Sequence, residues 1–177
     1  MTIVFSKPLL GFAAFSGTGK TTLLTKILPI LKSQGLRVAM IKHAHHKFDI
    51  DTPGKDSYEL RKAGASPMLI ASSRRIAVMI DLPEEQEPDL RELLHYINPK
   101  SIDLVLVEGF KHDAFPKIEL HRPTEGHPLL YTQDNSIIAI ASDAEEKYDT
   151  KLPQLDINNA DAIATFIIQF VKNRASI

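Results

Sequence analysis

One short stretch near the N-terminus constrains the fold more than any other feature of the sequence. Residues 14–21 read A-F-S-G-T-G-K-T, directly after an apolar run at 8–13 and directly before an amphipathic one. A strand, a glycine-rich turn and a helix in this order form the context of a phosphate-binding P-loop, usually written G-x-x-x-x-G-K-[ST]. Ala14 replaces the first glycine, a substitution that the motif tolerates. The stretch therefore predicts a nucleoside triphosphate site.

The residue types of this motif each have a physical role toward phosphate. Gly17 and Gly19 can adopt backbone angles closed to other residues, so that successive N–H groups turn inward around an anion. Lys20 is expected to reach the β- and γ-phosphates, and the Thr21 hydroxyl to ligate Mg²⁺. The start of the following helix adds its positive dipole end. The predicted phosphate-binding residues are Ser16, Gly17, Thr18, Gly19, Lys20, Thr21 and Thr22.

Composition excludes several other classes of protein. The chain has 177 residues, 44% of them hydrophobic, which suits one compact domain spanning 1–177. A formal net charge of −1 gives no general attraction to nucleic acid or to an anionic membrane. The absence of cysteine excludes disulfides, thiolate metal sites and cysteine nucleophiles. We therefore expect a cytoplasmic protein that binds neither nucleic acid nor membrane.

The order of predicted elements indicates a P-loop α/β fold. The helical spacing of apolar residues after Lys20 predicts a helix, and the apolar run at 36–41 predicts a buried strand that completes one βαβ unit. Further elements are expected as a short helix from 56, a hairpin of strands at 67–72 and 76–80, a helix at 90–97, strands at 102–107, 117–120 and 137–141, and a last helix capped by Asn158. The strand at 117–120 follows its predecessor too closely for a helical crossover, which predicts an antiparallel direction. The expected fold is a doubly wound three-layer α/β/α domain with a mixed, mostly parallel sheet and a β-hairpin insertion at 66–81.

Four acidic residues are candidates for the chemistry around the phosphates. Glu108 ends the most apolar predicted strand, where P-loop proteins place an acid near the metal, and Gly109 behind it would permit a close backbone approach. Asp49 and Asp51 lie two positions apart in a polar loop, so both could face the γ-phosphate, one orienting the attacking water and the other holding a metal-bound water. Each of these three could instead be a solvated surface carboxylate. Asp143 follows a late core strand, where it could read guanine or merely cap a turn.

A histidine cluster and the basic residues are less specific. His43, His45 and His46 lack an acid or cysteine at metal-ligand spacing, which favours phosphate contact or a surface role over a metal site. No arginine lies in the P-loop or in residues 42–55, and Arg61 is the nearest candidate. Hydrolysis without a positioned arginine runs at about 10⁻⁴ s⁻¹ in Ras-like proteins, so slow turnover is expected.

Three blocks of sequence together resemble the MobB family of molybdopterin-guanine dinucleotide biosynthesis proteins. The blocks are 14–22 (A-F-S-G-T-G-K-T-T), 41–65 (I-K-H-A-H-H-K-F-D-I-D-T-P-G-K-D-S-Y-E-L-R-K-A-G-A) and 106–112 (L-V-E-G-F-K-H). The resemblance implies a homodimeric GTP-binding protein with weak GTPase activity. It also implies a role beside the guanylyltransferase MobA in making or delivering the guanine dinucleotide form of molybdopterin.

The resemblance and the motifs together give a set of expected roles. The catalytic candidates are Lys20, Asp49 and Asp51; the metal candidates are Thr21, Asp51 and Glu108; the base-reading candidate is Asp143; the ligands are GTP and Mg²⁺. The extra P-loop lysine of related dimeric ATPases is replaced by Phe15, so the hairpin at 66–81 is the candidate dimer contact. Two alternatives remain: a module that holds the guanine dinucleotide without hydrolysis, and a small-molecule kinase whose phosphate lid would have to use the pair Arg74-Arg75.

Overall fold

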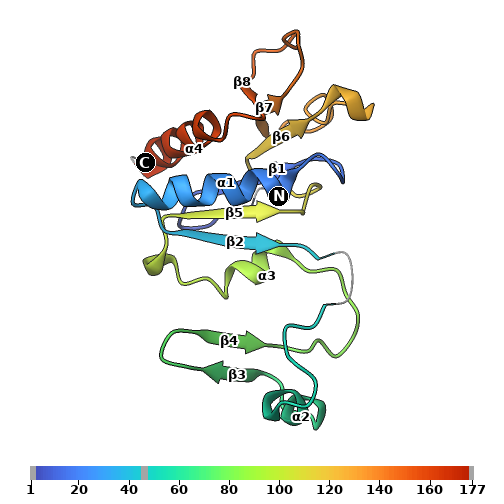
Figure 1. The fold of residues 1–177 in the computed structure, drawn as a ribbon, viewed down its shortest axis with the longest axis vertical. Coiled ribbons are helices and arrows are strands. Elements are labelled where there is room, and N and C mark those ends of the chain that lie inside the picture. Colours follow the sequence, from blue (N-terminus) through green and yellow to red (C-terminus); the bar gives the residue numbers. More distant parts are fainter. Residues whose placement is uncertain (1–2, 45–47, 176–177) are drawn as a thin grey trace. The chain divides into compact units, whose positions relative to one another are not determined.

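The computed structural model describes residues 3–44 and 48–175, and it divides into two compact units (Figure 1). The large unit comprises residues 1–43 and 89–177, and the small unit comprises residues 44–88. The large unit contains β1 (Leu9–Ala13), α1 (Lys20–Ser33), β2 (Val38–Lys42), α3 (Leu90–Leu94), η1 (Pro99–Ser101), β5 (Leu104–Glu108), β6 (Lys117–His121), η2 (Pro123–Glu125), β7 (Ile137–Ser142), β8 (Gln154–Asp156) and α4 (Ala160–Ala175). The small unit contains α2 (Asp56–Lys62), β3 (Met68–Ala71) and β4 (Ile76–Met79).

The large unit is built on a six-stranded sheet with the order β2-β5-β1-β6-β7-β8. Neighbouring strands in this sheet all run parallel, and the central strand β1 is buried along its whole length. Strands that are buried along most of their length, such as β1 and β5, are continuous apolar runs, which is why the sequence pattern identified them. The sequence pattern did not predict the short strand β8, whose three residues include Gln154 and Asp156. The doubly wound P-loop fold expected from the sequence is confirmed.

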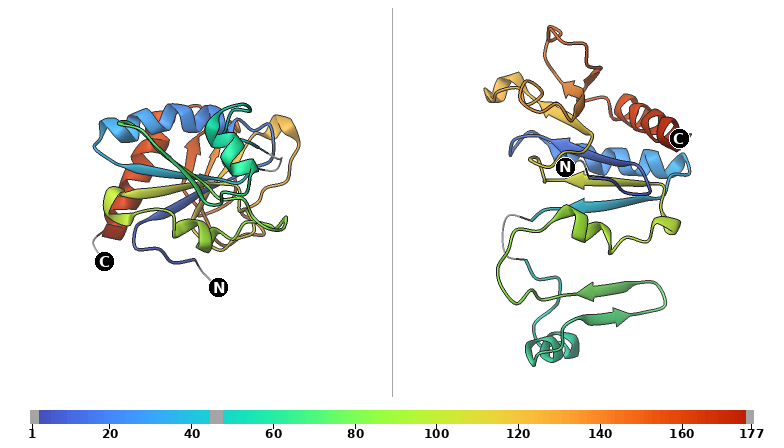
Figure 2. Two further views of the ribbon diagram at one scale, coloured as in Figure 1. Left: turned by 90° about the horizontal axis from the view of Figure 1, so that it is seen from below. Right: turned by 180° about the vertical axis from the view of Figure 1, so that it is seen from behind.

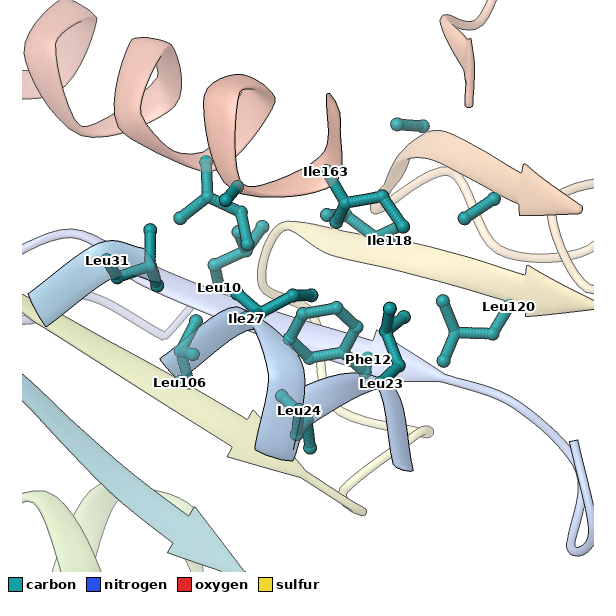
Figure 3. Packing of buried hydrophobic residues seen from close by; sticks show 14 of the residues in the cluster. Leu10, Phe12, Leu23, Leu24, Ile27, Leu31, Leu106, Ile118, Leu120 and Ile163 are labelled. Atoms are coloured by element: carbon teal, nitrogen blue, oxygen red, sulfur yellow. The ribbon is translucent and has the colours of Figure 1, made fainter. Parts of the chain in front are cut away.

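Alternate residues of the strands supply two separate cores. Leu10 and Phe12 of β1 pack beneath α1 and α4, which lie side by side on one face of the sheet (Figure 3). Leu9, one residue earlier, faces the opposite way and packs with Leu90 and Leu94 of α3. Figure 2 shows α1 and α3 on opposite faces of the sheet. Because all six strands run parallel, their C-terminal ends lie at one edge of the sheet, and the P-loop lies there with them.

The predicted antiparallel direction of β6 is wrong. β6 runs parallel to β1, and Lys117 pairs with Gly11, which on its other side pairs with Val107 near the end of β5. The connection at 109–116 therefore crosses sideways past β1 without returning the length of the sheet, so it needs no helix. Gly11 makes this crossing possible, because a Cβ there would lie 2.5 Å from the ring of Phe115 in the crossing segment.

The small unit is a hairpin preceded by a short helix. β3 and β4 pair antiparallel in a sheet of their own, as the sequence predicts. Leu69 lies opposite Val78, and Ala71 lies opposite Ile76, so these four side chains share one face of the hairpin. α2 begins at Asp56 after an N-cap at Lys55 that provides no side-chain hydrogen bond.

The last helix begins one residue later than the sequence suggested. Asn159, and not Asn158, caps α4, because its side-chain oxygen accepts a hydrogen bond from the backbone N–H of Ala162 at 3.0 Å. Across the described parts of the chain, no helix combines the length and apolar character that crossing a membrane requires.

Candidate phosphate-loop site

The P-loop connects β1 to α1 and is closed by its own polar contacts. Gly17 and Gly19 have φ angles of 91° and 92°, in the left-handed region that glycine adopts without strain. The Lys20 ammonium folds back over the loop and donates hydrogen bonds to the carbonyl oxygens of Ala14 at 3.2 Å and Phe15 at 2.8 Å. The Thr18 hydroxyl donates to the same Phe15 carbonyl at 3.0 Å. The loop thus has the compact glycine-dependent shape that the motif predicts.

The start of α1 leaves backbone donors available. Its N-cap is Gly19, which provides no side-chain hydrogen bond, and the first amide bonded within the helix is that of Leu23, to the Gly19 carbonyl. The preceding N–H groups of a helix have no intrahelical partner, and they point toward the helix start. Ser16, Thr21 and Thr22 are exposed there. Loop and helix together present the N–H groups and hydroxyls expected of an anion site.

The electrostatic surroundings of Lys20 are dominated by its burial and by other charges. Burial lowers the pKa of Lys20, the Glu108 carboxylate raises it, and the ammonium groups of Lys42 and Lys111 lower it again, with a net downward shift. Lys111 also lies over the Phe15 ring, with 5.9 Å between its Nζ and the ring centroid. Several cations therefore converge on the loop, as binding of a polyphosphate requires.

Glu108 lies at the end of β5, between the ends of β1 and β2. In the sheet register it is level with Phe12 on one side and Lys42 on the other. The Glu108 side chain is 13% exposed, and its carboxylate accepts a hydrogen bond from the Lys42 ammonium at 3.0 Å. The sequence prediction that this acid lies at the functional edge is consistent with this position.

The large unit supplies only part of a Mg²⁺ coordination shell. Mg²⁺ is normally held by one or two protein oxygens together with waters and substrate phosphates. Thr21 and Glu108 are oxygen donors of this kind, one at the start of α1 and the other beside the P-loop lysine. No group of three or more His, Asp or Glu side chains able to hold a metal occurs among the residues that the structure describes. The donor set thus suits a metal brought in with the phosphates.

Gly109 is tightly packed behind Glu108. Its φ is 95°, and a Cβ at this position would lie 2.6 Å from the Cβ of His43. The backbone N–H of His43 donates to the Glu108 carbonyl at 2.9 Å, which fixes the separation of the two segments. The close approach that the sequence suggested for Gly109 exists, and His43 is its partner.

Arg122 is a site residue that sequence reasoning missed. It follows β6 directly, and its Nε donates to the carbonyl oxygen of Thr18 in the P-loop at 3.3 Å. Its Nη1 pairs with the Asp143 carboxylate, and its Nη2 donates to the side-chain oxygen of Asn158 at 3.2 Å. The signal that could have identified it was its place directly after a strand, but the predicted antiparallel direction put that strand end at the wrong edge.

Asp143 borders a hollow at the ends of β7 and β8. The hollow measures about 420 Å³, within the range of about 300–1,000 Å³ typical of small-ligand sites. Its polar lining includes Ser142, Asp143, Tyr148, Gln154, Asp156 and Asn158. Asp143 thus lines this hollow, and its carboxylate is paired with the Arg122 guanidinium.

Arg122 begins the connection between β6 and β7, and three buried polar side chains of β6 bond to later residues of this connection. Lys117 pairs with Asp134 at 2.8 Å, Glu119 accepts from the N–H groups of Leu130 and Tyr131, and His121 bonds the His127 carbonyl. Burial raises the pKa of Glu119 against the lowering effect of its two backbone hydrogen bonds.

The same segment also touches the P-loop elsewhere. The His127 ring stacks on Phe15 at 4.3 Å between centroids. The Glu125 carboxylate lies 3.5 Å from the Thr18 hydroxyl. The connection between β6 and β7 is thus fixed against the phosphate loop at several points.

The two predicted loop carboxylates belong to the small unit. The Asp49 carboxylate pairs with the Arg61 guanidinium at 2.7 Å, and its pKa is lowered by a backbone hydrogen bond from Asp51 and by Arg61. Asp51 accepts from the Ser57 hydroxyl and the Thr52 N–H, while its Oδ2 is buried without a hydrogen-bond partner among the described residues. His45 and His46 lie outside the described residues, and the His43 ring lies 5.1 Å from that of Phe110.

Comparison with known proteins identifies the family. The family described as "MobB: Molybdopterin guanine dinucleotide synthesis protein B" matches residues 9–143. The molybdopterin-guanine dinucleotide biosynthesis adapter protein of Escherichia coli strain K12 is 48% identical over 168 residues, covering 94% of this chain and 95% of that protein. The protein of the same name from Haemophilus influenzae is 42% identical over 160 residues, covering 90% and 87%. A crystal structure of molybdopterin-guanine biosynthesis protein B matches with a TM-score of 0.73 and 28% identity over 93% of this chain and 99% of that one. The chain therefore belongs to the MobB family.

Proposed function

We propose that this chain is a GTP-binding adapter protein in molybdopterin-guanine dinucleotide biosynthesis. The observation that carries the proposal is the P-loop itself, with two left-handed glycines, a lysine folded over the loop and an uncapped helix start. The adapter role comes from the relatives, which bear that description at identities up to 48%. MobA and molybdopterin or its guanine dinucleotide are the proposed partners.

The chemistry proposed for the site is slow hydrolysis of GTP. Lys20 would bind the β- and γ-phosphates, while Thr21 and Glu108 would hold Mg²⁺ together with phosphate oxygens and water. Mg²⁺, when bound, neutralises charge on the phosphates. Asp51 remains a candidate to orient water or to bind metal-bound water, whereas Asp49 is engaged by Arg61. A weak activity is proposed because Arg122, the arginine found at the loop, is directed at a carbonyl and at Asp143.

The first test is calorimetric titration of the purified protein with GTP, GDP and ATP, with Mg²⁺ and without it. We expect a clear preference for GTP and a loss of binding in Lys20→Ala. Lys26→Ala is the matched control, because Lys26 is an exposed lysine on the same helix. Equal or tighter binding of ATP would refute the guanine assignment. Unchanged binding in Lys20→Ala would refute the P-loop as the site.

We further propose that the small unit mediates a homodimer. One face of the hairpin presents Leu69, Ala71, Ile76 and Val78, of which Leu69 is 60% and Ile76 70% exposed. An exposed apolar strand pair is unfavourable in water and readily pairs with another chain. A second copy of this hairpin presents the same face, so two copies can bury it symmetrically.

The oligomeric state tests this proposal. Sedimentation velocity is expected to show a dimer for the unmodified chain and a monomer for the Leu69→Lys/Ile76→Lys variant, because buried lysines at the interface are costly. Tyr96→Lys is the control, since Tyr96 is 68% exposed but lies in the large unit. A monomeric unmodified chain, or a dimeric double-lysine variant, would contradict the proposal.

A further inference from the structure

We propose that Arg122 sets the base selectivity of the nucleotide site by holding Asp143 in position to read guanine. This inference rests on the proposed function, because it requires that a nucleotide occupies the P-loop. It adds a positioning residue that acts through Asp143. The Arg122 guanidinium group lies where several neighbouring strands end, and it bonds three segments of the chain.

The three nitrogens of Arg122 each bond a different segment of the chain. Nε donates to Thr18 in the loop after β1, Nη1 to Asp143 after β7, and Nη2 to Asn158 after β8. Arg122 itself follows β6. The side chain is only 28% exposed, as is that of Asp143. One planar group therefore fixes the phosphate loop and the rim of the hollow to each other.

Guanidinium suits this position better than ammonium does. Its donors point in fixed, coplanar directions, so bonds to three partners hold the whole group rigid. Asp143 then has one defined orientation, because its Oδ2 is bound by Nη1. A lysine could keep the charge, but it could not bond Thr18, Asp143 and Asn158 from fixed directions.

A carboxylate held in this way distinguishes guanine from adenine by chemistry alone. Guanine presents two donors on one edge, the N1–H and the N2 amino group, whereas adenine has an acceptor at N1. An ionised carboxylate only accepts, and each of its oxygens has lone pairs for more than one donor. The Asp143 oxygen bonded to Arg122 can therefore still accept from a base. A freely rotating Asp143 would lose much of this discrimination, because ordering it would cost conformational entropy.

The test measures selectivity, which a purely structural defect would not change. Affinities for GTP, ATP and inorganic pyrophosphate are measured by calorimetry for the unmodified chain, Arg122→Ala, Asp143→Ala and the double variant. Pyrophosphate reports on the phosphate loop without a base. Arg37→Ala is the matched control, because Arg37 also bonds an aspartate and a backbone carbonyl, Asp103 and Lys100, but before β2 and β5 at the opposite edge of the sheet. Thermal melting confirms that each variant is folded.

Arg122→Ala is expected to lower the affinity for GTP by about 10- to 100-fold, the equivalent of one hydrogen bond to a charged group. Affinities for ATP and pyrophosphate are expected to fall by only about two- to threefold. This is the low end for the loss of one neutral hydrogen bond, because the Arg122 bond to the Thr18 carbonyl is long, at 3.3 Å. In the Asp143→Ala background, Arg122→Ala should cause no further loss of the preference for GTP. Arg37→Ala should leave all three affinities unchanged.

Two results would overturn the inference while leaving the proposed function intact. One is an unchanged ratio of GTP to ATP affinity in Arg122→Ala; the other is an equal loss for GTP, ATP and pyrophosphate. If Arg122→Ala fails to fold, Arg122→Lys decides instead, and it should lose at least about fivefold of the preference, because lysine cannot reproduce the fork. Failure of the proposed function is distinct: the unmodified chain would then show no preference for GTP, or no binding that depends on Lys20.

Discussion

Replacing Gly109 with alanine tests whether the backbone behind Glu108 is held by close packing. Two effects oppose an alanine there. The φ of 95° is unfavourable for a residue with a Cβ, at roughly 1–2 kcal/mol. The new Cβ would also lie 2.6 Å from the Cβ of His43, and overpacking of this kind costs roughly 1–3 kcal/mol. The sum is a loss of about 2–5 kcal/mol of unfolding free energy.

Gly35→Ala separates the two effects. Gly35 has a similar φ of 82°, but a Cβ there meets nothing within 4 Å. This control should lose only the conformational cost of roughly 1–2 kcal/mol. Alanine stiffens the unfolded chain equally in both variants, so that contribution cancels in the comparison. The difference between the variants, roughly 1–3 kcal/mol, measures the contact with His43.

Urea unfolding followed by far-ultraviolet circular dichroism is the suitable assay, because the chain contains no tryptophan. His43→Gly removes the opposing Cβ, so a double-mutant cycle with Gly109→Ala should recover most of that difference. Equal losses for Gly109→Ala and Gly35→Ala would refute the packing argument. Additive effects of His43→Gly and Gly109→Ala would refute His43 as the partner.

Three further predictions concern the stability of the large unit. A hydrogen bond from Arg37 lowers the pKa of Asp103 from 3.8 to about 2, so the pair stabilises the fold above pH 4 and loses this effect as the pH falls through 2. Asp103→Asn should therefore destabilise the protein above pH 4, and urea unfolding should show this destabilisation vanishing between pH 4 and pH 2. Gly11→Ala should cost about 1–3 kcal/mol by clashing with Phe115, and Phe115→Leu should relieve part of it in the double variant. Asn159→Ala should lower the thermal midpoint, corresponding to about 1 kcal/mol for a lost N-cap.

Much of the fold could be predicted because the information is local. The P-loop needs glycine at particular positions, and Gly17 and Gly19 have the left-handed angles that the motif requires. The buried strands of a parallel sheet are continuous apolar runs, such as 104–107 in β5. The hairpin follows from two strands and a short turn. These features depend on neighbours in the sequence.

The candidate site was less predictable because its partners are distant in sequence. Arg122 bonds Thr18, which lies 104 positions earlier, and Asn158, which lies 36 positions later. Nothing local distinguishes Asn158 from Asn159 as a helix cap, and only the bond to Arg122 shows that Asn158 is used elsewhere. The charged residues Lys117 and Glu119 alternate with apolar residues in β6. This alternation predicts a strand with one polar face, but it does not show which segment of the chain covers that face.

Local sequence patterns are thus enough to identify the phosphate loop, the strand and helix on either side of it and the family resemblance. Contacts between distant parts of the chain set the direction of β6, the burial of its polar side chains and the position of Arg122 beside the loop. β6 starts level with the middle of β1, where Lys117 pairs with Gly11, and it extends past the end of β1. A short connection can therefore cross the sheet at Gly11, and the end of β6 lies at the edge that carries the phosphate loop.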